Sequence, residues 1–157
     1  MIFKSPTRGE ISLEEVVEDI IKYINEDNTR HYKIIVGSDS QPKERETCFV
    51  SAIIVHRIGK GARYYYHKEV EPKVRNMRQR IFYEASLSLA LADKLSSLLK
   101  EKGRENMPVE IHLDVGTKGE TKELVKEIIG MIIGSGFEAK IKPDASAASK
   151  VADKYTK

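Results

Sequence analysis

KIIVGSD, residues 33–39, is a short apolar run that ends in an acidic residue. Its β-branched residues predict a buried strand. Because side chains two positions apart share one face of a strand, Asp39 lies on the face of Gly37, and the glycine leaves space beside the carboxylate. We therefore expect a strand that presents a carboxylate at its carboxyl end. The alternative interpretation is a turn-forming Asp39 that bonds only to nearby backbone.

The segments after residue 39 predict two more strands of an antiparallel meander. Residues 41–46 are a polar turn, residues 48–56 predict the second strand, and residues 63–70 predict the third strand after a glycine-containing turn. Three consecutive tyrosines, at 64–66, lie in the third strand. They cannot all face one way, so at most two of them could stack on bases, and packing within the sheet is the alternative.

Helices and single strands alternate through the rest of the chain. We expect helices over residues 12–26, 74–102, 121–133 and 144–156, and strands over 109–114 and 137–141. The resulting order predicts an α/β fold with a mixed five-stranded sheet, three strands antiparallel and two parallel, flanked by helices. The length suits one domain over residues 1–157. Residues 1–30 are expected to form an N-terminal helical extension, whose helix begins at a Ser12–Glu15 capping box.

The composition excludes several classes of protein. A hydrophobic content of 40% and a charged content of 32% exclude a disordered or fibrous chain. The net charge is only +3, so any affinity for nucleic acid must come from a local basic patch. The single cysteine, Cys48, excludes an internal disulfide and is typical of the reducing cytoplasm. No apolar run reaches membrane-spanning length, and we expect no membrane partner.

Glu84 is the second candidate acid. It lies on the long predicted helix, in line with an apolar stripe formed by Leu87, Leu91, Leu95 and Leu98. A carboxylate in line with a buried face must be paired or bound to a metal ion. The alternative partner for Glu84 is a nearby arginine such as Arg80.

Asp114 is the third candidate acid and closes the strand predicted over residues 109–114. Open α/β sheets bind ligands outside the carboxyl ends of their parallel strands, which is the position expected for Asp114. Gly116 and Gly119 follow it and allow close approach of the backbone to a ligand. A solvated acid at a strand end is the alternative. His112, on the same strand, is expected to be a hydrogen-bonded strand residue.

The fourth candidate acid is either Asp144 or Asp153. Asp144 follows a proline and could instead cap the last predicted helix. Asp153 lies off the apolar stripe of that helix, where a solvated face is the alternative. Carboxylates that converge repel one another unless a cation neutralises them. The four positions therefore suggest a site for Mg²⁺ or Mn²⁺, ions that prefer carboxylate oxygens and substrate phosphates.

A run of cationic residues without acids precedes Glu84. These residues are Lys73, Arg75, Arg78 and Arg80. They could contact the phosphates of a nucleic acid near the metal site, or they could be an ordinary solvated helix start. The scattered histidines give no zinc spacing, and the chain has neither a Walker-type phosphate loop nor a nucleophile-elbow sequence.

Four stretches of the chain resemble the ribonuclease-H-like superfamily and, more closely, its YkuK-like family of predicted nucleases. The stretches are residues 36–41, the helix with Glu84, residues 112–116 and residues 142–150. The resemblance implies a carboxylate tetrad that binds two divalent ions, with Asp39 bridging them and Glu84 and Asp114 as further ligands. The closing stretch is similar to that of type-2 ribonucleases H, which favours Asp144 over Asp153 as the fourth ligand.

Three functional hypotheses follow. The first is a metal-dependent nuclease that hydrolyses phosphodiester bonds in DNA or RNA by a two-metal mechanism. The second is a non-catalytic nucleic-acid-binding module on the same fold, because the chain carries a local basic run and an ambiguous fourth acid. The third is a nucleotide-binding phosphotransfer domain, against which the missing phosphate loop argues.

Overall fold

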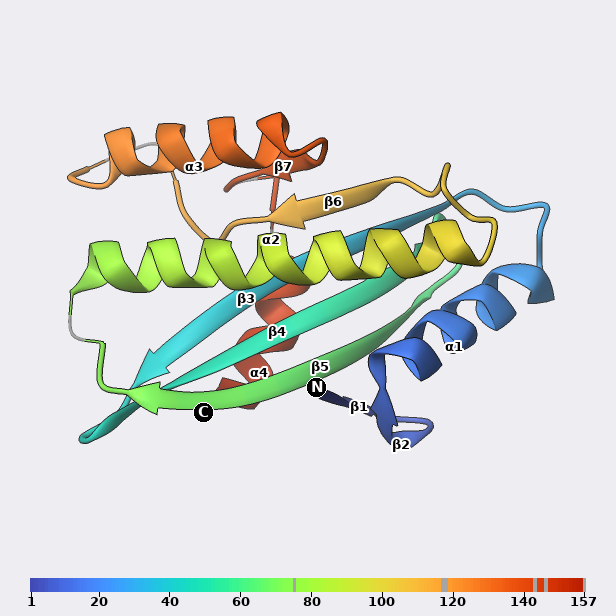
Figure 1. Ribbon diagram of the computed structural model, residues 1–157, viewed down its shortest axis with the longest axis horizontal. Helices are drawn as coiled ribbons and strands as arrows, with labels where there is room; N and C mark the ends of the chain where they lie inside the picture. The colour runs from blue at the N-terminus through green and yellow to red at the C-terminus, as the bar shows by residue number, and fades with distance from the viewer. Residues whose placement is uncertain (75, 117–118, 143, 146, 157) are drawn as a thin grey trace.

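The computed structural model describes residues 1–157 except 75, 117–118, 143, 146 and 157. The described residues form one seven-stranded sheet in the order β2-β1-β5-β4-β3-β6-β7 (Figure 1). The strands are β1 (Ile2–Ser5), β2 (Gly9–Ser12), β3 (Tyr32–Pro42), β4 (Glu46–Arg57), β5 (Ala62–Pro72), β6 (Val109–His112) and β7 (Glu138–Lys140). The helices are α1 (Leu13–Glu26), α2 (Met77–Glu101), α3 (Lys122–Gly134) and α4 (Ala147–Thr156).

The α/β class and the mixed sheet are confirmed, but the predicted number of five strands is wrong. The first strands, β1 and β2, form an antiparallel hairpin, and β1 also pairs with β5 through Lys4 and Tyr66. The hairpin therefore extends the sheet beyond β5, and it occupies the first part of the segment predicted as a helical extension. The helix that follows begins as predicted, because Ser12 and Glu15 form the reciprocal capping box.

The central strand β3 is longer than predicted because its pairing with β4 continues through polar residues. The β3–β4 ladder runs from the Tyr32–Arg57 pair to the Pro42–Thr47 pair. The parallel ladder between β3 and β6, in contrast, ends at the Gly37–His112 pair. The carboxyl end of β3 therefore extends beyond β6, and Asp39 lies on this extension.

The helices cover the two faces of the sheet unequally. Helices α1, α2 and α3 pack on one face, whereas α4 packs on the other (Figure 1). The larger core includes Val36 of β3, Ile53 of β4 and Leu95 of α2. On the opposite face, Ile35 and Ala148 belong to a smaller core beneath α4. Alternation along β3 thus directs Ser38 and Ser40 toward α2, and Gly37 and Asp39 toward the face that carries α4.

Gly37 allows α4 to approach the sheet closely. A Cβ atom placed on Gly37 would lie 2.6 Å from the Cβ atom of Ala148 and 3.1 Å from the carbonyl oxygen of His112. Such distances are shorter than van der Waals contact, so a side chain at position 37 would push α4 away from β3. This contact fixes the position of α4 relative to Asp39, two residues further along the strand.

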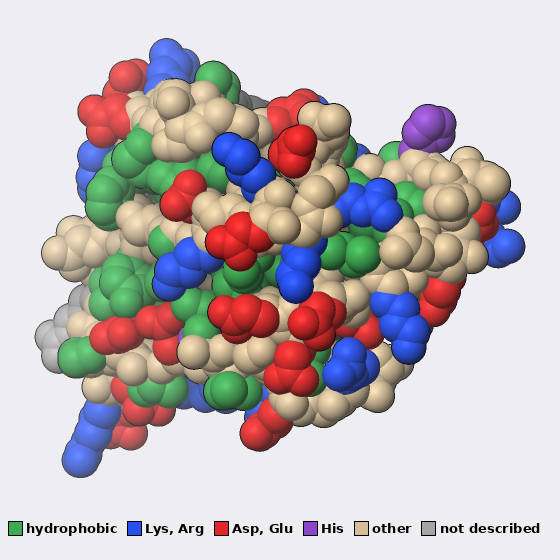
Figure 2. Space-filling model, turned by 45° about the vertical axis from the view of Figure 1, so that its right-hand side comes forward, with side chains coloured by type: hydrophobic (Ala, Val, Ile, Leu, Met, Phe, Trp, Pro, Cys, Tyr) green, Lys and Arg blue, Asp and Glu red, His purple; other side chains and the backbone are tan. Residues whose placement is uncertain are grey.

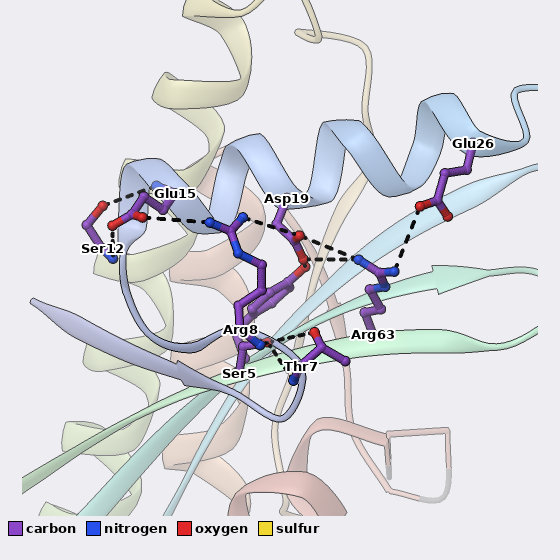
Figure 3. Close-up of polar contacts among 9 residues, drawn as sticks. Ser5, Thr7, Arg8, Ser12, Glu15, Asp19, Glu26 and Arg63 are labelled. Carbon is purple, nitrogen blue, oxygen red and sulfur yellow. Dashed lines mark hydrogen bonds and ion pairs between the residues drawn. The ribbon is translucent and has the colours of Figure 1, made fainter.

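A buried carboxylate attaches α1 to the edge of the sheet (Figure 3). Asp19 is 2% exposed and accepts a hydrogen bond from the Tyr65 hydroxyl. It also forms ion pairs with Arg63 at 3.4 Å and with Arg8 at 3.6 Å. Because a buried charge is tolerated only when it is paired, these partners tie α1 both to β5 and to the loop of the β1–β2 hairpin.

No helix in the part of the chain that the structure describes is long and apolar enough to cross a membrane.

Candidate active site

Three predicted acids from separate segments line one cavity of about 300 Å³. Asp39 comes from β3, Glu84 from α2, and Asp114 from the segment that follows β6. The cavity lies where β3 extends beyond β6, so the end of the parallel ladder opens the space between the three carboxylates. The cavity is also lined by two cationic side chains, Arg80 and Lys142.

Hydroxyl groups position α2 and Glu84 against β3. The Ser38 hydroxyl lies 2.8 Å from the hydroxyls of both Ser51 and Ser88, which joins β3 to β4 and to α2 in a buried polar cluster. One helical turn before Ser88, the carboxylate of Glu84 accepts a hydrogen bond from Ser40. These serines were not predicted from the sequence as parts of the site. Their alternation with Gly37 and Asp39 along the strand was the available signal.

The cavity raises the pKa values of two of its acids. The pKa of Asp39 is raised to about 6, chiefly by burial and also by the negative charges of Asp114 and Asp153, while the hydrogen bond from the Ser40 backbone opposes the increase. The pKa of Glu84 is raised to about 7, chiefly by burial and also by the negative charge of Asp39, while the Ser40 hydroxyl opposes the increase. Like charges therefore face one another here without full compensation, as expected at a site that receives a cation.

Asp114 has a cationic partner within the chain. The Nζ atom of Lys142 lies 3.0 Å from Oδ1 of Asp114, whose side chain is 30% exposed. The lysine side chain is itself 57% exposed, so its ammonium group can leave the pair without disrupting a core. The strand was predicted to run through Asp114. In the structure the β6 ladder ends at His112, so Asp114 lies after the strand.

The two candidates for the fourth acid occupy different environments. Asp144 is exposed and lies in a turn before α4, where its backbone N–H donates to the Ile141 carbonyl at 2.8 Å. It does not lie in the helix predicted from residue 144, because α4 begins at Ala147. Asp153 lies on α4, and its charge raises the pKa of Asp39. The electrostatics thus link Asp153 to the cavity.

Of the predicted basic run, Lys73 precedes α2, whereas Arg78 and Arg80 lie in its first turns. Lys73 and Arg78 are exposed, and Arg78 donates to the Glu120 carbonyl at 3.3 Å. Arg75 lies outside the described residues. Arg80 lines the cavity, and its positive charge lowers the pKa values of both Asp39 and Glu84. Within the part of the chain that the structure covers, the buried Nε atom of Arg80 has no hydrogen-bond partner.

His112 pairs with Glu110, which lies two residues earlier on the same strand, β6. Its Nε2 atom lies 2.9 Å from the Glu110 carboxylate, which is also 3.7 Å from the Lys33 ammonium. Both His112 and Glu110 are buried. This is the hydrogen-bonded strand histidine that the sequence analysis expected.

The donors around the cavity suit a hard divalent cation in chemical type. Mg²⁺ and Mn²⁺ prefer carboxylate oxygens, and Asp39, Glu84 and Asp114 supply such oxygens to the cavity. The side chains surround the cavity without converging on a point. Among the described residues, no three Asp, Glu, His or Cys side chains are arranged as ligands of a single ion.

Comparison with known proteins agrees with this fold. A family model described as "Ribonuclease H-like" matches residues 15–157. The chain belongs to the ribonuclease H-like family. Within this family, it is similar to the "Uncharacterized protein YkuK" of Bacillus subtilis (strain 168), with 32% identity over 167 residues that cover 99% of this chain and 97% of the relative. The resemblance to the YkuK-like family is therefore confirmed.

Proposed function

We propose that this member of the ribonuclease H-like family is a divalent-metal-dependent nuclease. The observation that carries the proposal is the meeting of Asp39, Glu84 and Asp114 at one cavity, from three segments that are far apart in the sequence. The raised pKa values of Asp39 and Glu84 support it, because they reflect carboxylates held together without enough positive charge.

The carboxylates would hold Mg²⁺ or Mn²⁺, with two ions expected when substrate is present. Bound there, the ions would activate a water molecule and stabilise the leaving oxygen of a phosphodiester. Asp39, Glu84 and Asp114 are the proposed ligands. For the fourth ligand we now favour Asp153 over Asp144, since the charge of Asp153 raises the pKa of Asp39.

The cationic side chains at the cavity would position the substrate. Arg80 has a buried Nε donor without a partner among the described residues, and a substrate phosphate oxygen would satisfy it. Lys142 would exchange its bond with Asp114 for a phosphate when a metal ion takes that carboxylate. Both groups would orient the phosphodiester beside the acids. Lys73, Arg75 and Arg78 are proposed as more distant contacts along the nucleic acid.

A second candidate function is a non-catalytic nucleic-acid-binding module. The observation that favours it is the ion pair between Lys142 and Asp114, which supplies within the chain some of the positive charge that a metal ion would bring. In this case the acids would be a remnant, and nucleic acid would bind through the basic residues with a strong dependence on salt.

Calorimetric titration of Mn²⁺, followed by a cleavage assay, tests the proposal. Wild-type protein should bind Mn²⁺ and cleave a labelled oligonucleotide from a panel of single-stranded DNA, single-stranded RNA and hybrid. The variant with Asp39→Asn and Asp114→Asn should lose both activities while keeping its melting temperature or raising it. Asp93→Asn is the control, because Asp93 is an exposed acid on α2 outside the cavity.

The results separate the two candidate functions. Binding of oligonucleotide that survives loss of the acids, with no cleavage in Mg²⁺ or Mn²⁺, would support the binding module. Cleavage by the double variant at the wild-type rate would refute the proposed role of the acids.

A further inference from the structure

A second and larger cavity, of about 680 Å³, lies between β1, β5 and the end of α4. Besides His67 and Glu69, two tyrosines and two lysines line it. We call these residues, Lys4, Tyr66, Lys68 and Tyr155, the tyrosine–lysine surface. The cavity is large enough for a nucleotide, since pockets for small ligands commonly measure roughly 300–1,000 Å³.

Strand register places the lysines and a tyrosine on one face of the sheet. Lys4 of β1 is paired with Tyr66 of β5, so their side chains leave the sheet on the same side. Lys68 lies two residues after Tyr66 and shares its face. Tyr65 points the opposite way, into the main core, where it binds Asp19. The tyrosine run thus supplies one core residue and leaves Tyr64 and Tyr66 beside α4.

The rings are held in fixed positions before any ligand arrives. Tyr155 stacks on Tyr66 with ring centroids 3.6 Å apart and an angle of 11° between the ring planes. The Tyr155 hydroxyl lies 2.7 Å from the hydroxyl of Tyr64. The ammonium group of Lys154 lies 5.6 Å from the centre of the Tyr155 ring. A base that stacks on these rings would therefore lose little affinity to the ordering of side chains.

The surface is in register with the proposed catalytic acids. Asp39 pairs with Val50 across β3 and β4, and Val50 pairs with Lys68 across β4 and β5. Adjacent strands are about 4.8 Å apart, so the backbones at Asp39 and Lys68 are separated by about 10 Å on the same sheet face. The end of α4 lies at this part of the sheet, with Tyr155 against Tyr66.

The face of the molecule drawn in Figure 2 carries both signs of charge. On the face drawn in Figure 2, which is turned from the view with α2 in front, Lys and Arg side chains are interspersed with Asp and Glu side chains. Phosphates approaching this face would meet both signs of charge. The tyrosine–lysine surface combines cationic groups with flat rings, which is the combination that binds the phosphates and bases of a single strand.

We propose that the tyrosine–lysine surface binds unpaired nucleotides of a single-stranded nucleic acid whose reacting phosphate lies at the Asp39 cavity. The inference rests on the proposed function and names its substrate class. Lys4 and Lys68 contact phosphates, and the Tyr66–Tyr155 pair stacks on a base. Single strands are favoured over duplexes, because only an unpaired base exposes its ring face to a tyrosine.

Fluorescence anisotropy of a labelled 12-nucleotide single strand, in EDTA, tests the surface apart from catalysis. Tyr66→Leu keeps an apolar side chain against α4 but removes the ring, and it should raise the Kd about tenfold. The pair Lys4→Ala and Lys68→Ala should raise the Kd and reduce the slope of log Kd against log salt by about 1.4, from two lost phosphate contacts. Matched controls are Phe82→Leu, an exposed ring on α2, and the pair Lys60→Ala and Lys100→Ala.

The results test the tyrosine–lysine surface independently of the proposed catalytic acids. Weaker single-strand binding in the surface variants, with normal binding in the controls, supports the inference even if no cleavage is found. Cleavage by wild-type protein with unchanged KM and Kd in the surface variants overturns the inference and leaves the proposed function intact. Stronger binding of a duplex of the same length, or a change of oligomeric state in Tyr66→Leu measured by sedimentation, also overturns it, the latter because it identifies a second copy as the occupant.

Discussion

Ser40 of β3 donates a hydrogen bond from its hydroxyl to the carboxylate of Glu84 on α2. The bond connects the strand that carries Asp39 to the helix that carries the second acid. It favours the charged form of Glu84, whereas burial and the charge of Asp39 favour the protonated form. The serine thus limits how far the pKa of Glu84 rises.

Removing this hydroxyl should raise the pKa of Glu84. In Ser40→Ala the carboxylate loses the donor that opposes burial, so its pKa should rise above the value of about 7 expected for the wild-type protein. Carbon-detected NMR titration of the glutamate side chains measures the change. Ser86→Ala is the control, since Ser86 donates to the Phe82 carbonyl on the same helix. An unchanged or lower pKa of Glu84 would contradict the role given to Ser40.

Neutralising Glu84 should stabilise the protein above neutral pH. Its folded pKa of about 7 exceeds the ordinary value of 4.5, so the folded protein holds a proton that the unfolded chain releases. The free energy of unfolding therefore falls as the pH rises from about 4.5 to 7. Glu84→Gln should remove this loss and be more stable by about 1–2 kcal/mol at pH 8, after allowance for partial exposure, with little such gain at pH 4.

Urea denaturation at both pH values measures the difference. Glu101→Gln is the control, because Glu101 is an exposed acid at the end of the same helix. A stabilisation of the Gln variant that is equal at pH 4 and pH 8 would argue against a repulsive carboxylate site.

Metal binding should compete with protons at the cavity. Because Asp39 has a pKa of about 6, Mn²⁺ binding below that pH requires release of a proton, and affinity should increase as the pH rises through 6 and level off above it. At a concentration 100 times the Kd, Mn²⁺ should stabilise the folded protein by about 2.7 kcal/mol. Melting temperatures recorded with and without Mn²⁺ give the profile. Asp39→Asn should show no such pH-dependent increase.

The last-helix acid can be identified by a pair of single variants. Asp153→Asn should lower the pKa of Asp39, since the charge of Asp153 contributes to raising it. It should also weaken Mn²⁺ binding if Asp153 is a ligand. Asp144→Asn should change neither property, because Asp144 lies in the exposed turn before α4. Calorimetry on both variants decides between them, and the reverse pattern would restore Asp144 as the fourth ligand.

A methyl group at position 37 should displace α4. In Gly37→Ala, the new Cβ would lie 2.6 Å from that of Ala148, and relief of the overlap should cost about 1–3 kcal/mol of stability. The double variant with Ala148→Gly should recover part of that loss. Chemical denaturation measures both. Gly130→Ala, in α3, is the control, since no atom lies within 4 Å of its added Cβ, and it should stabilise the protein slightly.

The parts of the fold predicted from the sequence are those with strong local patterns. The three central strands, the long helix with Glu84 and the capping box at Ser12 each have a run or spacing that is sufficient by itself. The β1–β2 hairpin has only four residues in each strand, with Phe3 and Ile11 as its buried hydrophobic residues. Its pairing with β5, through Lys4 and Tyr66, is distant in sequence, so periodicity could not reveal it.

The candidate site was predictable in its residue types but not in its connections. Strand ends and an apolar helix stripe were enough to select Asp39, Glu84 and Asp114. The choice between Asp144 and Asp153 depends on where α4 begins and how it crosses the sheet, which the contact between Gly37 and Ala148 determines. The pairing of Lys142 with Asp114 likewise depends on the path of the chain after β7, for which the sequence gives no periodic signal.

Because the β3–β6 ladder ends early, one part of β3 is paired on both sides and the other part on one side only. From Ile34 to Gly37, the strand is paired with a neighbour on each side. From Ser38 to Pro42 it continues along β4 beyond the end of β6, so this segment pairs with β4 and not with β6. A carboxylate on such a segment can shift by a fraction of an ångström to meet a ligand while the anchored part keeps its alignment. Amide hydrogens near Asp39 should therefore exchange faster than those of residues 34–37. The site would then combine a rigid strand with an end that can adjust to its ligand.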